Sequence, residues 1–265
     1  MRLRELHIYP LKSGAGIARE EAYLEARGLK GDRRWLVVDD NGRFLSARTH
    51  PHMLLIKAIP DAEGLILSAP HAGKIKISFD GSNPTLGPVS IWKDTCNAFY
   101  LSQEADRWLS EVLATPCHLV YMSDEIERSV NKAEARPGDL VSFADAYPLL
   151  LTTESSLADL NNRLTTPISM QRFRPNLVVD GLEAFTEDRW QHLRIGDLEF
   201  ECCSPCTRCV LTTVDPQTGN KDPQGEPLKT LRTYRQNDQG ILFGINLIPR
   251  SHGSMRVGNV LEVLA

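Results

Sequence analysis

The feature that most constrains the fold is a series of short strand-like stretches separated by turn residues. WLVV and RFLSAR flank Asp40-Asn41-Gly42, whose Asn-Gly pair supplies the positive φ values of a tight hairpin turn. Three more stretches of this kind follow, at 65–69 (LILSA), 74–79 (KIKISF) and 89–92 (VSIW). Short strands at this spacing predict a small β-barrel or sandwich.

Three segments indicate helices. Residues 102–114 carry an apolar stripe at helical spacing, and Ser102 can cap the helix by accepting a backbone N–H. A second helix is predicted at 154–164. A shorter third helix starts at Pro227, because proline suits the first turn.

The second half of the chain adds strands, predicted at 176–180, 192–202, 209–215 and 255–264. Ile195-Gly196-Asp197 and Val257-Gly258-Asn259 predict hairpin turns. The fold class is therefore mainly β with a few helices (α+β). A domain boundary is expected near 115–125.

Composition limits the partners. The 265 residues suffice for one or two domains, and a net charge of −4 gives no global attraction to nucleic acid or to anionic membranes. The N-terminal MRLRELHIYPLKS lacks the apolar core of a signal peptide, and no run of 18 apolar residues occurs. We expect a cytoplasmic protein with no nucleic-acid or membrane partner, whose thiols stay reduced.

Four of the six cysteines lie in ECCSPCTRCVLTTVDP (201–216), where three follow the pattern C-x2-C-x2-C. The spacing admits a zinc site, an iron–sulfur cluster, a disulfide, strand packing or one reactive thiol. A reducing compartment disfavours the disulfide. Structural zinc commonly takes two ligand pairs, and Cys96, Cys117 and seven scattered histidines form no second pair. The bacterial ferredoxin run continues to a C-P element that is missing after Cys209.

Two interpretations of these cysteines remain: packing in a strand, or one reactive thiol. Cys202 alternates with Phe200 and Leu198, as strand-packing residues do, and packing is also the simpler interpretation of Cys203. Arg208 precedes Cys209, and a guanidinium beside a thiol favours the thiolate that attacks or binds metal. Spacing alone does not decide between Cys206 and Cys209.

The stretch CTRCVLTTVDPQTGNKDPQGEPLKTLRTYR (206–235) resembles the core motif of the MOSC domain. This domain is shared by molybdenum cofactor sulfurase, the mitochondrial amidoxime reducing component and YcbX-type proteins. Further segments agree in order: IYPLKSGAG (8–16), GDRRWLVVDDNGRFLSAR (31–48), SSLADLNNRL (155–164), FRPNLVV (173–179) and LRIGDLEF (193–200). The resemblance implies a MOSC N-terminal β-barrel domain over 1–118 and a MOSC β-barrel domain over 119–265.

The resemblance implies a molybdenum–pterin cofactor with a phosphate tail, whose metal is bound by the Cys209 thiolate; soft thiolate suits such a metal. Cys206 is then a structural neighbour. The family's cofactor contacts map to Lys12, Ser13, Arg33, Arg48, Asp145, Arg174, Asn176, Thr207 and Arg208. Two positions depart from relatives: the flank AYP after Asp145 replaces a Thr/Ser-rich one, and Asn246 stands where some relatives carry an aromatic residue.

The family's activity implies a molybdenum-dependent reductase of N-hydroxylated compounds: amidoximes, hydroxylamines and N-hydroxylated bases. Many YcbX-type proteins add a plant-type ferredoxin domain with C-x4-C-x2-C spacing, and this chain holds no such segment. We therefore expect no iron–sulfur cluster in the chain. Electrons would come from a separate donor protein of the ferredoxin or flavoprotein type.

Two other functions stay open. The chain could carry the cofactor or sulfur, the latter as a Cys209 persulfide. MOSC domains are also associated with pyridoxal phosphate through their sulfurase context, although no lysine here lies in a recognisable Schiff-base motif. The second is a non-catalytic zinc-binding module.

Overall fold

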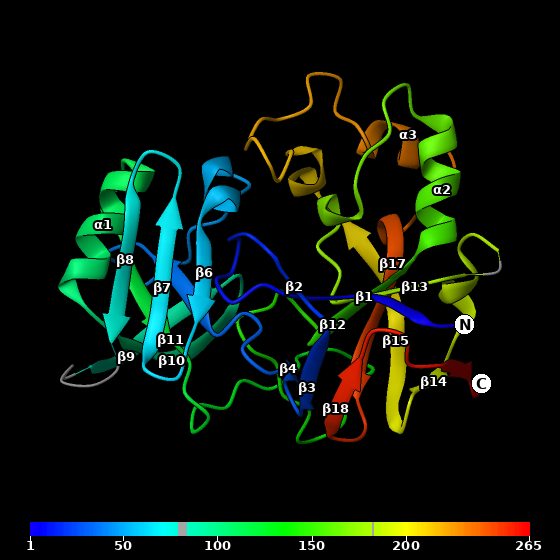
Figure 1. Cartoon of the computed structure of the whole chain (residues 1–265), viewed down its shortest axis with the longest axis horizontal. Coiled ribbons are helices and arrows are strands. Elements are labelled where there is room, and N and C mark those ends of the chain that lie inside the picture. The colour runs from blue at the N-terminus through cyan, green and yellow to red at the C-terminus, as the bar shows by residue number, and fades with distance from the viewer. Residues whose placement is uncertain (79–83, 182) are drawn as a thin grey trace.

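The protein is mainly β with a few helices, as predicted. A computed structural model describes residues 1–78, 84–181 and 183–265. Within these residues the strands form one nine-stranded sheet, one four-stranded sheet and two three-stranded sheets. Figure 1 shows the largest sheet on the side of the molecule that also carries both termini, and the β6–β8 sheet with helix α1 on the other.

The nine-stranded sheet has the order β19-β14-β15-β17-β12-β13-β1-β2, with β16 paired to β17. Neighbours are antiparallel except β12 and β13, which are parallel. The strands are β1 (Leu3–Ile8), β2 (Ile17–Arg19), β12 (Leu149–Thr153), β13 (Leu177–Val179), β14 (His192–Ile195), β15 (Leu198–Arg208), β16 (Gln236–Asn237), β17 (Gly240–Pro249) and β19 (Leu261–Val263).

The smaller sheets have the orders β5-β11-β10-β9, β18-β3-β4 and β6-β7-β8. Their strands are β3 (Glu21–Glu25), β4 (Gly28–Leu29), β5 (Trp35–Val38), β6 (Lys57–Pro60), β7 (Gly64–Ala69), β8 (Gly73–Ser78), β9 (Thr85–Ile91), β10 (Asp94–Tyr100), β11 (His118–Tyr121) and β18 (Gly253–Arg256). The first four strands of the chain thus pair with each other and with strands of the second half. The boundary after residue 118 stays a prediction.

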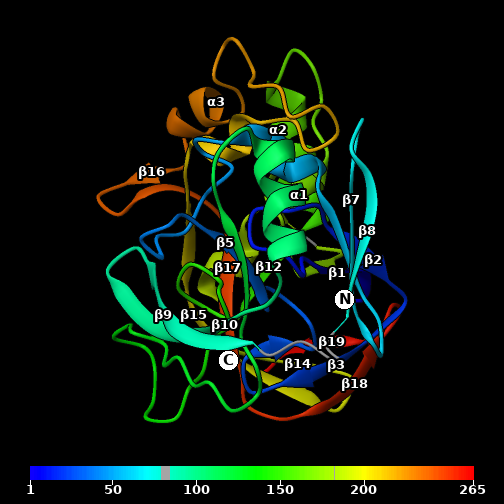
Figure 2. The same cartoon turned by 90° about the vertical axis from the view of Figure 1, so that its left-hand side faces the viewer.

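The helices are α1 (Gln103–Leu113), α2 (Glu154–Arg163) and α3 (Leu228–Arg232), with short 3-10 turns η1 (Pro51–Leu55), η2 (Met170–Arg172), η3 (Thr186–Arg189) and η4 (Val210–Thr213). Ser102 caps α1, because its hydroxyl accepts the backbone N–H groups of Glu104 and Ala105 at 3.2 and 3.3 Å. The buried face of α1 packs into an apolar cluster with β7 and β11, beside the β7–β8 hairpin (Figure 2). No helix of the described residues is long and apolar enough to cross a membrane.

Two strand predictions and one hairpin prediction are wrong. The stretch RFLSAR forms isolated bridges at Arg43 and Phe44 and no strand. The run 209–215 forms the turn η4, and β15 instead continues to Arg208. The turn at Val257-Gly258-Asn259 exists, but β18 pairs with β3 and β19 with β14, so they form no hairpin. The Ile195-Gly196-Asp197 turn does join β14 to β15. For the predicted strand 74–79, β8 covers all but residue 79, which lies outside the described residues.

His118 in β11 forms pH-dependent hydrogen bonds to α1 and to the loop after β5. Its Nδ1 lies 2.8 Å from Asp106 Oδ2, and its Nε2 lies 3.1 Å from Asp40 Oδ1. The hydrogen bond to Asp106 raises the pKa of His118 above 6.5. A raised folded-state pKa means that the stabilisation is complete below pH 6.5 and is lost as the pH rises through the folded-state pKa.

We therefore expect the difference in free energy of unfolding between wild type and His118→Gln to shrink from about pH 6 to about pH 9 in urea denaturation. His252→Gln, which changes an exposed histidine elsewhere, should show no such trend. A difference that stays constant or grows with pH would contradict this assignment.

Candidate functional site

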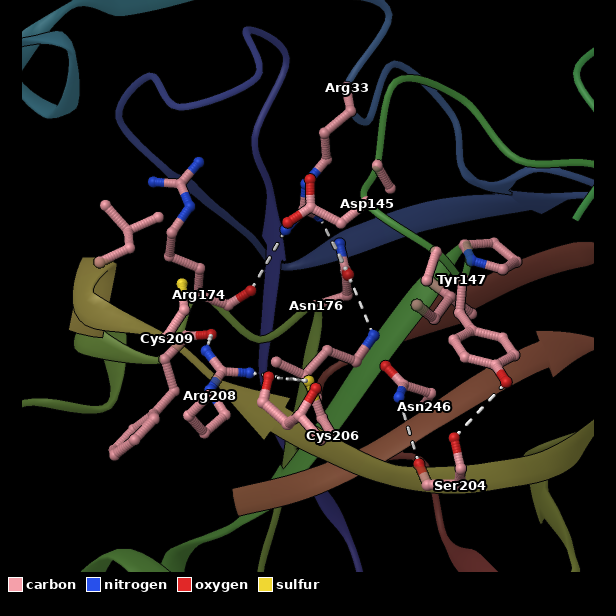
Figure 3. Close-up of a pocket in the computed structure, with 18 of the residues that line it drawn as sticks. Arg33, Asp145, Tyr147, Arg174, Asn176, Ser204, Cys206, Arg208, Cys209 and Asn246 are labelled. Atoms are coloured by element: carbon pink, nitrogen blue, oxygen red, sulfur yellow. Dashed lines mark hydrogen bonds between the residues drawn. The ribbon is translucent and has the colours of Figure 1, made fainter. Parts of the chain in front are cut away.

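A cavity of about 700 Å³ lies where segments of the two halves of the chain meet. It falls within the usual size range of small-molecule pockets. All ten residues predicted for the site line this one cavity: Lys12, Ser13, Arg33, Arg48, Asp145, Arg174, Asn176, Thr207, Arg208 and Cys209. Figure 3 shows six of them together with Cys206, Tyr147, Ser204 and Asn246. Their roles stay predictions; their spatial convergence is a fact of the fold.

The cysteine segment reaches the cavity because β15 is bulged. Its register against β17 shifts between Cys202 and Pro205, and again between Pro205 and Thr207. Proline has no N–H to give to the ladder, so it is found in sheets at bulges and edges. Such bulges re-aim side chains and are frequent beside active sites. Here the bulges separate the packing part of β15 from the part that lines the cavity.

Cys202 and Cys203 follow the packing interpretation. Cys202 packs against the apolar cluster of the large sheet, and Cys203 against a second cluster that contains Tyr147. Burial raises the pKa of both thiols to about 12. Neither of them lines the cavity, whereas Cys206 and Cys209 do.

Cys209 marks the point where β15 ends and η4 begins. Its carbonyl accepts the backbone N–H of Thr212 at 3.0 Å and the Thr212 hydroxyl at 2.9 Å. The Thr213 hydroxyl donates to the Val210 carbonyl at 2.7 Å. The Val-Leu-Thr-Thr run therefore fixes a tight turn, and this turn presents the Cys209 side chain to the cavity.

Arg208 contacts a different sulfur from the one its sequence position indicated. Its Nη1 donates to Sγ of Cys206 at 3.0 Å, and its Nη2 donates to the Phe173 carbonyl at 2.6 Å. Within the described residues, the recorded sulfur contact of this guanidinium is with Cys206 and not with Cys209. Figure 3 shows the Cys209 sulfur on the side of Arg174. Nε of Arg208 is buried without a hydrogen-bond partner, so a donor is left over at the cavity wall.

Three of the residues predicted for the site have left-handed backbones. Ser13, Arg33 and Arg174 have φ values of 66°, 48° and 56°. This conformation is uncommon for side chains other than glycine and asparagine, and it clusters at functional sites. It turns the backbone so that Arg33 and Arg174 approach each other: Nη2 of Arg33 donates to the Arg174 carbonyl at 3.3 Å.

Tyr9 supports both of these arginines. The guanidinium carbons of Arg174 and Arg33 lie 4.2 and 4.4 Å from the centroid of its buried ring. The electron-rich ring face attracts both cations. The Tyr9 hydroxyl donates to the Pro175 carbonyl at 3.1 Å, and burial raises its pKa to about 12. Burial lowers the pKa of Arg174 to about 10, so it stays charged at neutral pH.

Lys12, Asp145 and Arg48 form an ion cluster at another part of the wall. Buried Lys12 donates to Asp145 and, at 2.6 Å, to the Phe143 carbonyl. Nη2 of Arg48 lies 3.5 Å from the other oxygen of Asp145. Desolvation acts to raise the pKa of Asp145, but the charge and hydrogen bond of Lys12, the Trp92 N–H and the Arg48 charge together hold this pKa well below its usual range. Asp145 is therefore a carboxylate that orders two cations.

Asn176 connects the cavity wall to the large sheet. Its Oδ1 accepts from Arg33 at 3.0 Å and from the Leu150 backbone N–H at 3.2 Å, and its Nδ2 donates to the His7 carbonyl at 3.1 Å. It is fully buried. Because the protein itself uses this amide, Asn176 orients Arg33 and aligns β1 with β12.

Four further polar or aromatic residues line the cavity and were not among the predicted site residues: Trp92, Tyr147, Ser204 and Asn246. Asn246 Nδ2 donates to the Ser204 carbonyl at 3.2 Å, and the Ser204 hydroxyl lies 3.5 Å from the Tyr147 hydroxyl (Figure 3). Tyr147 donates to Glu134 at 2.7 Å. Tyr147 and Asn246 lie at the two positions where the sequence departs from the family pattern. These departures were the only features of the sequence that pointed to them as cavity residues.

Positive charge dominates the cavity. Among the described residues that line it, seven are lysine or arginine and two are carboxylates, although the whole chain has a net charge of −4. No three histidine, cysteine, aspartate or glutamate side chains of the described residues come together as a metal site. The fold and site thus define a mainly β protein with a cationic, thiol-bearing pocket between its two halves.

Comparison with known proteins gives the family. The models of the MOSC N-terminal β-barrel domain and of the MOSC domain match residues 1–116 and 138–262. Human mitochondrial amidoxime reducing component 2 is 35% identical over 96% of this chain and 81% of that protein. Human mitochondrial amidoxime-reducing component 1 is 34% identical over 98% and 82%. The chain belongs to the family of MOSC-domain proteins with an N-terminal MOSC β-barrel domain.

A solved structure adds little to this assignment. YiiM from Geobacillus stearothermophilus matches with a TM-score of 0.34 and 15% identity, over 45% of this chain and 55% of that chain. A match this low carries no argument.

Anion binding tests whether the Tyr9 ring holds Arg33 and Arg174 in place. Tyr9→Leu removes the aromatic face, so we expect binding of inorganic pyrophosphate to weaken roughly tenfold in calorimetric titration. Tyr9→Phe keeps the ring and should bind within about twofold of wild type. Circular dichroism checks that both variants fold. Equal affinity of folded Tyr9→Leu and wild type would contradict the role.

Proposed function

We propose that this protein binds a molybdenum–pterin cofactor through the cationic cavity and reduces N-hydroxylated compounds such as amidoximes and hydroxylamines. The observation that carries the proposal is the free thiol of Cys209 in a cavity whose other charged residues are mostly cations. A thiolate is a soft ligand for such a metal, and the cations suit a phosphate-bearing group. Relatives named amidoxime reducing components support the same class of activity.

The residues present fit such a group. The unpartnered Nε of Arg208 and the guanidinium of Arg174, which forms no ion pair among the described residues, leave a donor and positive charge unbalanced by the protein. Arg33, in contrast, is paired with the buried carboxylate of Asp32. A bound phosphate would accept from donors of this kind in bidentate fashion. We assign Lys12, Ser13, Arg33, Arg48, Asp145, Arg174, Asn176, Thr207 and Arg208 to binding and orienting the cofactor.

The reaction takes two electrons and two protons to convert an N–OH group into N–H and water. The bound metal would supply the two-electron chemistry. The chain's part is to hold the metal through Cys209, to fix the cofactor by charge, and to shape the remaining space for the substrate. Tyr147, Ser204 and Asn246 form a polar stretch of this wall, which suits a substrate that carries hydrogen-bonding groups.

Electrons would come from a separate donor protein of the ferredoxin or flavoprotein type. The names of the relatives, amidoxime reducing components, support a reaction that is shared with other proteins. The cytoplasmic location likewise stays a prediction, since the relatives that match are named as mitochondrial components.

Cys209→Ala is the direct test of ligation. Protein made in a host that synthesises the cofactor should contain molybdenum, and we expect Cys209→Ala to lose most of it together with benzamidoxime reduction. Cys206→Ala is the matched control, since it removes the other thiol that lines the cavity, and it should keep its molybdenum. Wild-type protein without molybdenum, or unchanged metal content in Cys209→Ala, would refute the proposal.

The electron source separates a reductase from a cofactor carrier. Molybdenum-loaded protein should reduce benzamidoxime with a chemical one-electron donor, such as reduced methyl viologen, and not with NADH or NADPH alone. Turnover with NADH alone would remove the need for a donor protein. Full loading without turnover under any reductant would favour the carrier function.

A further inference from the structure

Trp92 is an exposed aromatic residue in a strained backbone position. It lies in the two-residue turn between β9 and β10, and its φ is 56°. Left-handed conformations are outliers for bulky residues and persist only where the surroundings hold them. Its side chain is nevertheless 48% exposed and lines the cavity. Asparagine or glycine would adopt this backbone conformation with less strain.

The indole is held by contacts on several sides. Nε1 of Trp92 donates to Oδ1 of Asp145 at 3.0 Å. The Arg48 guanidinium lies 4.2 Å from the ring, and Phe44 meets it edge-on at 4.7 Å. Trp92 therefore joins the ion cluster of Lys12, Arg48 and Asp145 described above. The ring is fixed in place while part of its surface stays open to the cavity.

These contacts bridge the two halves of the molecule. Trp92 belongs to the β9–β10 hairpin of the four-stranded sheet, whereas Asp145 lies in the segment that leads into β12 of the nine-stranded sheet. The hydrogen bond between them thus joins two elements of the cavity wall. Moving the hairpin tip away from this part of the wall requires that this hydrogen bond break.

We propose that Trp92 is a latch residue, which closes the cavity over the planar, phosphate-bearing group held by Lys12 and Arg48 and slows its release. This inference rests on the proposed function for the identity of that group. When an anion binds Lys12 and Arg48, it competes with Asp145 for both cations. The Trp92 N–H then remains as a partner of Asp145, and the indole face offers a stacking surface to a planar ring. The latch acts on release rather than on chemistry.

Trp92→Asn separates the latch from a structural role. Asparagine tolerates the left-handed backbone, so this variant should be at least as thermally stable as wild type. It lacks the indole, so we expect the bound pterin to leave roughly tenfold faster. The measurement follows pterin and molybdenum remaining on the protein after dilution, with pterin detected by fluorescence after oxidation. Stable Trp92→Asn protein that releases pterin at the wild-type rate would overturn the latch.

Two further variants sharpen the result. Trp92→Phe keeps an aromatic ring but loses the N–H, and should release pterin at an intermediate rate. Lys93→Ala changes the other residue of the same turn and should behave as wild type. Equal acceleration in Lys93→Ala would show that any disturbance of the turn suffices, and would also overturn the specific role of the indole.

The test remains valid if the proposed function fails. Wild-type protein that holds no molybdenum–pterin would contradict that function, and the latch is then tested with inorganic pyrophosphate as the probe. Stopped-flow dissociation of pyrophosphate should be several-fold faster from Trp92→Asn than from wild type. Equal rates would refute the part of the latch that acts through the Trp92–Asp145 hydrogen bond on an anion held by Lys12 and Arg48.

Discussion

The constraint on which the rest of the structure depends is the crowding of like charges around one cavity. Burial desolvates these cations, which is the main reason why the pKa values of Lys12 and Arg174 are lowered, and repulsion between neighbouring cations adds to the cost. The protein offsets this with fixed partners. The Tyr9 ring lies under two guanidiniums, and Asp145 orders Lys12 and Arg48. The excess positive charge that remains is what a phosphate-bearing ligand would neutralise.

The pairing of strands from the two halves of the chain brings the cavity residues together. Strand β1 pairs with β13 of the second half, so the chain that follows it delivers Lys12 and Ser13 to the cavity and Tyr9 to the two arginines that it supports. Asn176 stabilises this arrangement, because its side chain forms hydrogen bonds to both β1 and β12. The bulged end of β15 adds the cysteine segment from the opposite side. The site therefore depends on both halves of the chain at once, and neither half contains it alone.

Much of the site could be predicted from motifs, whereas its contacts could not. The resemblance placed ten residues in one cavity, because each lies within a recognisable segment. The central strands β12 and β17 escaped the sequence analysis, since they are buried on both faces and read as apolar runs rather than as alternating patterns. The strand predicted at 209–215 was wrong because hydroxyl-to-carbonyl bonds of Thr212 and Thr213 favour a turn over β propensity. The partner of Arg208 depends on bulge geometry, which spacing does not encode.

The central claim is that the Cys209 sulfur binds the metal of a pterin cofactor. Molybdenum K-edge X-ray absorption on protein from a cofactor-competent host tests it most directly, because it counts the sulfur atoms around the metal. We expect the dithiolene sulfurs plus one thiolate sulfur in wild type and in Cys206→Ala, and the loss of that one sulfur in Cys209→Ser. An unchanged sulfur count in Cys209→Ser, or its loss in Cys206→Ala, would contradict the account.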